Sequence, residues 1–229
     1  MRRIGFVLSP GFQVMSFAAL SVFEYANKEM GEPVYDVRLL CETGGLMRSS
    51  IGVSVATEPF DDTTFDTLFF SRGTESSTPG LIEFLRQAPE RCRRVAATCT
   101  SAFILAEAGL LDGRRATTHW SRARDLQARF PKVKVEEDRI FVVDGPVWTS
   151  AGMTTGIDLA LAMVEQDLGA DVARAVARQL VVYHRRAGGQ SQFSALLEVE
   201  PKSDRIQSAL AYAKRNLDKK LESSLKRRI

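Results

Sequence analysis

Short apolar runs alternate along the chain with segments in which apolar residues recur at helical spacing. Four runs rich in branched and aromatic residues are predicted to be buried strands: residues 4–8, 34–40, 67–70 and 95–98. Helical patterns follow three of them, over residues 15–28, 81–87 and 102–111. Because strand–helix alternation is typical of parallel strands joined by crossover helices, we predict an α/β fold with a mostly parallel sheet between two helical layers.

Two hairpins are predicted outside this repeating order. Residues 47–59, in which Val53 and Val55 share one face, suggest a hairpin excursion from the sheet. Residues 140–143 and 147–149 flank the turn sequence Asp144-Gly145-Pro146. We therefore expect antiparallel strands beside the parallel ones.

Two helices are indicated late in the chain. Apolar residues repeat at helical spacing over 157–168 until Gly169 stops the helix, and Thr155 with Asp158 has the form of a capping box. Residues 171–185, which include His184, carry a second apolar stripe. That stripe either packs on the core or pairs with a second copy, and the spacing does not choose between the two.

A separate unit is predicted at the C-terminal end. After a Gly-rich connection that contains Pro201, Ser203 is a good N-cap for a helix whose apolar stripe runs from Ile206 to Leu217. We therefore divide the chain into a domain of residues 1–195 and a linker with a first helix over residues 196–229. From residue 214 onward the chain is locally basic, which is more often typical of a solvated segment than of a phosphate-binding surface.

Composition narrows the class of protein further. The chain has 229 residues, 45% hydrophobic and 26% charged, as in globular proteins, and its net charge of +3 is too small to identify a nucleic-acid partner. No apolar run approaches the roughly 18 residues of a membrane span, and Pro10 interrupts the N-terminal run too early for a signal peptide. Three cysteines without metal-ligand spacing indicate a reduced, cytoplasmic protein, and we expect no metal and no cofactor.

The segment from Arg93 to Phe103 carries the clearest chemical signal. A buried strand ends there, one residue turns sharply and a helix begins, which is the geometry of a nucleophile elbow. Cys99 stands at the apex, where the first amides of the helix favour negative charge, so we expect a lowered thiol pKa. The alternative is that Cys99 is a small buried hydrophobic residue, as free cysteines more often are. We interpret Cys41 and Cys92 in that way.

A nucleophilic thiol needs a base, and the chain has two histidines. His119 follows Cys99 by 20 residues, after a helix and a turn, and can return to the same end of the sheet. His184 stands beside Arg185 and Arg186 and is read as a surface or packing residue. A lone histidine is more often structural than catalytic, so Cys99 and His119 are candidates only.

The stretch from Ala97 to Trp120 resembles the elbow-to-histidine region of the ThiJ/PfpI superfamily, which is class I glutamine amidotransferase-like. The stretches 149–160 and 186–193 are similar to two further segments of GlxA-like regulators, which join such a domain to an AraC-type helix-turn-helix region. The resemblance covers essentially residues 3–217 and implies a flavodoxin-like fold with an added C-terminal helix. Residues 204–221 resemble the first helix of the DNA-binding region, whose base-reading helices are missing here.

The sequence departs from the enzymes of that superfamily at its site. The acidic position on the first helix is Ser16, and a hydroxyl cannot act as a carboxylate acid or base near neutral pH. The loop after the third core strand keeps Gly73 but has Arg72 where a second glycine is usual. These departures argue for a pocket with less chemistry in it. Its predicted ligand-binding residues are Ser16, Arg72, Gly73, Cys99, Thr100, His119 and Gly152.

Three functions remain open at this point. The resemblance favours a ligand-sensing, dimerising domain that takes a small-molecule effector and regulates transcription through attached DNA-binding helices, with DNA and a second copy of the chain as partners and no membrane. The second is a cysteine hydrolase or isocyanide hydratase that uses Cys99 with His119. The third is an oxidative sensor in which the Cys99 sulfur takes up oxygen.

Overall fold

The N-terminal strand β1 lies inside the central sheet and pairs in parallel with a neighbour on each side. In the computed structural model, which describes residues 1–73, 77–184, 186 and 189–190, eight strands lie in the order β3-β4-β2-β1-β5-β6-β10-β9. Their bounds are β1 Arg2–Leu8, β2 Tyr35–Cys41, β3 Thr43–Arg48, β4 Ser54–Pro59, β5 Thr67–Ser71, β6 Arg94–Thr98, β9 Phe141–Asp144 and β10 Val147–Ser150. The pairs β3–β4 and β9–β10 are antiparallel and the other pairs are parallel.

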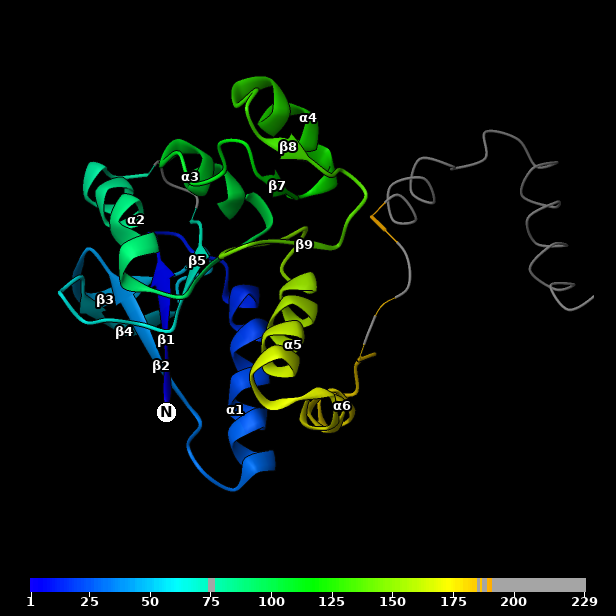
Figure 1. Ribbon diagram of the computed structural model, residues 1–229. Helices are drawn as coiled ribbons and strands as arrows, with labels where there is room; N and C mark the ends of the chain where they lie inside the picture. The colour runs from blue at the N-terminus through cyan, green and yellow to red at the C-terminus, as the bar shows by residue number, and fades with distance from the viewer. Residues whose placement is uncertain (74–76, 185, 187–188, 191–229) are drawn as a thin grey trace, which may run out of the picture. The chain divides into compact units, whose positions relative to one another are not determined.

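Helices cover both faces of this sheet (Figure 1). Helices α1 Ala18–Met30, α5 Thr155–Leu168 and α6 Ala170–Gln179 pack on one face, and α2 Pro79–Arg91 and α3 Ala102–Glu107 pack on the other. Successive strand residues point to opposite faces of the sheet. Phe69 therefore packs under α1, α5 and α6, while Leu68 and Phe70 pack under α2 and α3. The predicted three-layer α/β fold is therefore confirmed.

Most predicted elements are present with shifted ends. The four buried strands and both hairpins are confirmed, although the first hairpin begins earlier, at Thr43. Helix α2 runs longer than expected, from an N-cap at Thr78 to Arg91, with Pro89 inside its last turns. Helix α3 is shorter, because the chain turns at Gly109 with a φ of 81°.

Two predictions are wrong, and one helix and one pair of short strands were not predicted. Helix α6 ends at Gln179, so His184 does not lie in a helix, and Val181 takes a positive φ of 56° just beyond the helix. The capping box fails because Thr154 occupies the N-cap of α5 and the Thr155 hydroxyl bonds Gly152. Helix α4 Trp120–Arg129 and the short parallel pair β7 Arg115–Ala116 with β8 Lys134–Val135 had no predicted counterpart.

Some predictions fall on residues that the structure does not describe. The boundary at residues 195 and 196 and the helix expected over residues 204–221 lie outside the described residues. Within the described part, no helix is both long enough and apolar enough to cross a membrane.

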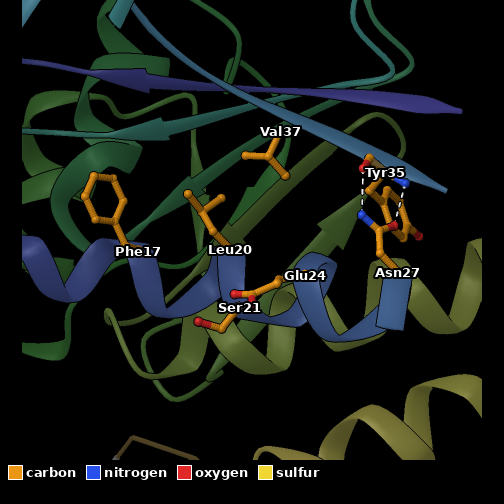
Figure 2. Close-up of a pocket in the computed structure, with 7 residues that line it drawn as sticks. All are labelled: Phe17, Leu20, Ser21, Glu24, Asn27, Tyr35 and Val37. Atoms are coloured by element: carbon orange, nitrogen blue, oxygen red, sulfur yellow. Dashed lines mark hydrogen bonds between the residues drawn. The ribbon is translucent and has the colours of Figure 1, made fainter. Parts of the chain in front are cut away.

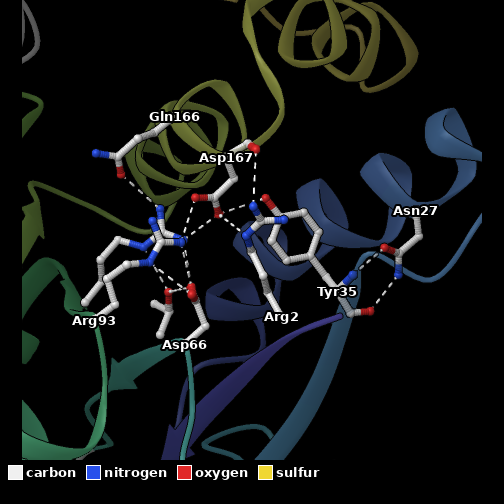
Figure 3. A network of polar contacts seen from close by, with 9 residues as sticks. Arg2, Asn27, Tyr35, Asp66, Arg93, Gln166 and Asp167 are labelled. Carbon is white, nitrogen blue, oxygen red and sulfur yellow. Dashed lines mark hydrogen bonds and ion pairs between the residues drawn. The ribbon is translucent and has the colours of Figure 1, made fainter.

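A buried ionic network ties α5 to the amino ends of the strands (Figure 3). Arg94, 2% exposed at the start of β6, lies 2.6 Å from a carboxylate oxygen of Asp167 and 3.0 Å from Asp66. The Asp167 side chain is fully buried near the end of α5, where a negative charge opposes the helix dipole. Arg93 and the Tyr35 hydroxyl also donate to it, at 2.7 and 3.1 Å. Arg2 of β1 lies 3.7 Å from the same carboxylate, so Asp167 joins three strands to one helix.

Replacing Asp167 by Asn should strongly destabilise the fold. The substitution removes the negative charge that offsets buried Arg94, and breaking a buried ion pair typically costs about 3–5 kcal/mol. Urea unfolding followed by circular dichroism measures the change in the free energy of unfolding. Asp171→Asn is the matched control: among the described residues Asp171 is paired with Arg174 alone, at the surface, so its loss should stay within about 0.5 kcal/mol. Equal losses in both variants would show that the network contributes little.

Candidate functional site: an elbow at Cys99

The chain reverses direction sharply at Cys99. Strand β6 ends at Thr98, Cys99 has a positive φ of 54°, and a short 3₁₀ turn over Cys99–Ser101 leads into α3. A non-glycine residue in this conformation stores strain of about 1–3 kcal/mol, which the surrounding contacts must offset. The predicted bend is therefore present, at the carboxyl end of a central parallel strand where α/β proteins bind ligands.

Two loops are bonded to the elbow and hold its shape. The backbone N–H of Arg72, just after β5, donates to the Ser101 hydroxyl at 2.7 Å. The Thr118 hydroxyl donates to the Cys99 carbonyl at 2.9 Å. Residues far apart in the sequence therefore meet at this turn, and Arg72 and the segment before α4 belong to one site.

The Cys99 thiol is half-buried and is not activated. Burial raises the pKa of Cys99 above its ordinary value, and the backbone N–H and the hydroxyl of Thr100 lower it by less. The expectation of a lowered pKa is wrong, because the loss of water around the sulfur outweighs the amides at the start of the turn.

His119 caps α4 with its ring. Nδ1 accepts from the Ser121 backbone N–H at 3.3 Å and lies 2.8 Å from the Ser121 hydroxyl. Burial lowers the pKa of His119, so the ring is neutral near pH 7. With Nδ1 accepting, we place the ring proton on Nε2. Among the described residues, no hydrogen bond joins this ring to the Cys99 thiol.

The other predicted site residues lie at the same carboxyl edge in different roles. Buried Ser16 donates its hydroxyl to the Gln13 carbonyl at 2.7 Å, within the 3₁₀ turn that precedes α1. Gly152, between β10 and α5, donates its N–H to Thr155 at 2.7 Å. Neither has a hydrogen bond to the elbow among the described residues, so the structure places them near its strands without joining them to Cys99.

Gly73 and Arg72 follow β5 and differ in what they offer. A Cβ at Gly73 would lie 1.9 Å from the Pro10 carbonyl oxygen, so only glycine lets this loop pass the one after β1. Half-buried Arg72 forms no ion pair with the residues that the structure describes, which leaves its guanidinium available. Gly73 is therefore required by the close passage of these two loops.

Sequence reasoning missed two polar groups at this edge. The Ser71 hydroxyl, 1% exposed at the end of β5, has no hydrogen-bond partner among the described residues. Thr118, which holds the Cys99 carbonyl, was likewise not singled out. The only available signal was position, since Ser71 ends a buried strand and Thr118 precedes His119. A polar group brought to Ser71 would relieve a cost of about 1–3 kcal/mol.

Two hollows in the surface lie away from the elbow. One of about 420 Å³ is lined by residues of α1 and β2, among them Ser21, Glu24 and Val37 (Figure 2). Another of about 250 Å³ is lined by Phe141, Asp158, Ala162, Glu165, His184 and Arg186. None of the predicted ligand-binding residues lines either hollow. Within the described part of the chain, no group of three or more metal-type side chains gathers.

Comparison with known proteins agrees with the fold and the elbow. The sequence model of the DJ-1/PfpI family matches residues 4–166. The HTH-type transcriptional regulator CdhR of Pseudomonas aeruginosa is 38% identical over 185 residues, which are 77% of this chain and 54% of that protein. The chain therefore spans about half the length of this relative. The resemblance to regulators that carry such a domain is confirmed.

Two further likenesses bear on function and fold. Isonitrile hydratase of Pseudomonas putida is 40% identical, but over only 99 residues, which are 43% of this chain and 42% of that enzyme. The crystal structure of an AraC family transcriptional regulator from Pseudomonas putida superposes with a TM-score of 0.72 and 22% identity, over 79% of this chain and all of that one. At this identity the superposition supports the fold alone.

The reaction of Cys99 with iodoacetamide should follow a pKa above the ordinary thiol value of 9.0. At pH 7 less than about 1% of the thiol would then be ionised, so alkylation should be slow and should keep rising with pH. Mass spectrometry of the 229-residue chain gives the rate at Cys99 separately from Cys41 and Cys92. The urea-unfolded chain is the control and should react faster at Cys99. A rate that levels off below pH 8 would contradict this account and indicate an activated nucleophile.

Proposed function

Because this chain belongs to the DJ-1/PfpI family, we propose that it is the effector-binding part of an AraC-type transcription regulator and binds a small molecule at the Cys99 elbow. The observation that carries this proposal is the 38% identity to an HTH-type regulator over 77% of the chain. The elbow supplies a place for the effector. The response would pass to DNA-binding helices that follow this domain.

The chemistry of the elbow favours binding over catalysis. The pKa of the Cys99 thiol is raised. The ring nitrogen Nδ1 of His119 accepts a hydrogen bond from Ser121, and the Ser16 hydroxyl donates to the Gln13 carbonyl. An isonitrile hydratase-like mechanism would need the thiol and an acid or base to act together. None of these three groups is arranged to do so.

The polar groups of the site define the class of effector. Arg72 offers a guanidinium, and His119 offers an N–H from the free side of its ring. Ser71 adds a buried hydroxyl without a partner. Such a set suits a small ligand that carries a carboxylate or an amide, because Arg pairs with carboxylates through two parallel hydrogen bonds. Cys99 and Thr100 would then line the pocket and react with nothing.

The remaining parts of the proposal concern partners and boundaries. We place the end of the sensor domain near residue 195 and the start of the DNA-binding region after it. The complete protein would act in the cytoplasm as a homodimer on DNA, as expected of a regulator whose operator is read twice.

A panel of metabolites with carboxylate or amide groups should contain a ligand of the 229-residue chain. Arg72→Ala should weaken its binding by about tenfold or more, the cost of losing a charge-assisted hydrogen bond. Cys99→Ala should keep the affinity within about threefold, because the sulfur only lines the pocket. Thermal shift screening followed by calorimetry measures both effects. Arg174→Ala is the control, since Arg174 is paired with Asp171 on the outer face of α6.

Two outcomes would decide against the sensor. Turnover of an isocyanide, amide or ester that disappears in Cys99→Ala would establish the enzyme instead. Selective uptake of oxygen at Cys99 under mild peroxide, with Cys41 and Cys92 untouched, would favour the oxidative sensor. With the complete gene product, the ligand should also shift the affinity for DNA from its own promoter region.

A further inference from the structure

Gln190 is a buried polar side chain at the point where the described chain continues toward residues 191–229. It is 4% exposed, although Val181 and Tyr183 earlier in the chain are largely exposed. It belongs to the stretch 186–193 that marks the resemblance to the regulators but has no place in any catalytic scheme. The hydrogen bonds of the Gln190 side-chain amide indicate what this residue does.

Both ends of the Gln190 amide are engaged. Nε2 lies within hydrogen-bond distance of four oxygens at 2.9–3.2 Å: the Thr117 hydroxyl and the carbonyls of Thr118, Glu137 and Arg139. Oε1 accepts from the backbone N–H of Trp120 at 2.8 Å. An amide nitrogen has two hydrogens, so four acceptors share them. The site therefore requires a donor at one end of this side chain and an acceptor at the other.

These bonds reach the segment that holds the elbow. Thr118 accepts from Gln190 through its carbonyl, and its hydroxyl donates to the Cys99 carbonyl at 2.9 Å. Trp120, whose N–H Gln190 caps, is the first residue of α4 and the neighbour of His119. The Gln190 side chain therefore contacts Thr118 and Trp120, on either side of His119. Through Thr118 it is linked to Cys99.

The chain around Gln190 is fixed at two further places. A Cβ on Gly189 would lie 2.3 Å from the Asp138 carbonyl oxygen, so the backbone passes there at contact distance, and the N–H of Gln190 donates to that oxygen at 2.9 Å. Arg186 pairs with both carboxylate oxygens of Asp158 on α5 and donates to the Thr154 carbonyl at 2.9 Å. Arg186 is therefore held against α5, and Gly189 and Gln190 lie against the loop before β9.

We infer that Gln190 is a positioning residue for the Cys99–His119 site, because its amide holds segment 117–120 in place. A ligand that shifts segment 117–120 must stretch or break the bonds from that segment to Gln190. Coupling of this kind is reciprocal, so disturbing Gln190 must change the elbow. The inference rests on the proposed function only in taking the elbow as the place where the effector binds.

Alkylation of Cys99 in Gln190 variants tests whether a change at Gln190 alters the elbow. In the full 229-residue chain, Gln190→Ala and Gln190→Glu should raise the rate of reaction with iodoacetamide by about fivefold or more, the lower end of typical coupling factors. The glutamate variant keeps the shape but sets a carboxylate oxygen against four acceptors, so its effect should be larger. Mass spectrometry resolves Cys99 from the other two thiols.

Gln127→Ala is the matched control. The Gln127 amide also bonds at both ends, to the Val133 carbonyl and the Val135 N–H, but neither bond leads to the elbow. Both substitutions should lower the melting temperature, whereas only the Gln190 variants should change the Cys99 rate. A purely structural role for Gln190 would leave that rate unchanged.

Hydrogen exchange in the wild-type chain tests the reverse direction. After alkylation of Cys99 by iodoacetamide, the amides of Gln190 and Trp120 should exchange about fivefold faster or more. The amide of Val135, bonded to Gln127, should keep its rate. Unchanged exchange at Gln190 and Trp120 would overturn the coupling even if the Gln190 variants failed to fold.

Failure of this inference is distinct from failure of the proposed function. Neither experiment uses an effector or DNA. A metabolite that binds at Arg72 while Gln190 variants react at the wild-type rate would remove the coupling and leave the sensor. Coupled rates without any bound metabolite would remove the sensor and leave the coupling.

Discussion

Strand β6 is held at both ends, and the site depends on this. At its amino end, Arg94 is buried against Asp167 and Asp66, which fixes the strand to α5 and to the start of β5. At its carboxyl end, the chain must turn through the strained conformation of Cys99. A strained residue keeps its geometry only if its neighbours cannot relax. The close approach of α5 to this end, where a Cβ on Gly156 would lie 2.9 Å from Thr98, removes the remaining freedom.

Much of the fold could be predicted from the sequence because the central strands are short, continuous apolar runs. Such runs are buried on both sides, between two helical layers, and their alternation with helices predicted that the strands are parallel. Helix α4 escaped prediction because its pattern is weak: only Ala123 and Leu126 are buried in it, and its start is set by bonds from His119 and Gln190. The length of α6 was overestimated because an apolar stripe does not show where the chain turns away.

The site could be predicted only in part. The bend at Cys99 follows from local sequence, since a strand that hands over at once to a helix leaves one residue for the turn. The direction of the Cys99 pKa does not follow, because it depends on how much water the packed elements remove. The same holds for Gly73, which the sequence assigned to the ligand and the structure assigns to a close passage beside Pro10. Contacts between residues distant in the chain set these properties.

The cap on α4 also has a consequence for the order in which the chain matures. The first amide of this helix receives its acceptor from a side chain 70 residues later. During synthesis, the helix and the loop before it leave the ribosome without that partner, and the segment beside His119 stays incompletely bonded until residue 190 has emerged. The hydrogen bonds around His119 are therefore complete only once Gln190 has been made and has folded against the start of α4.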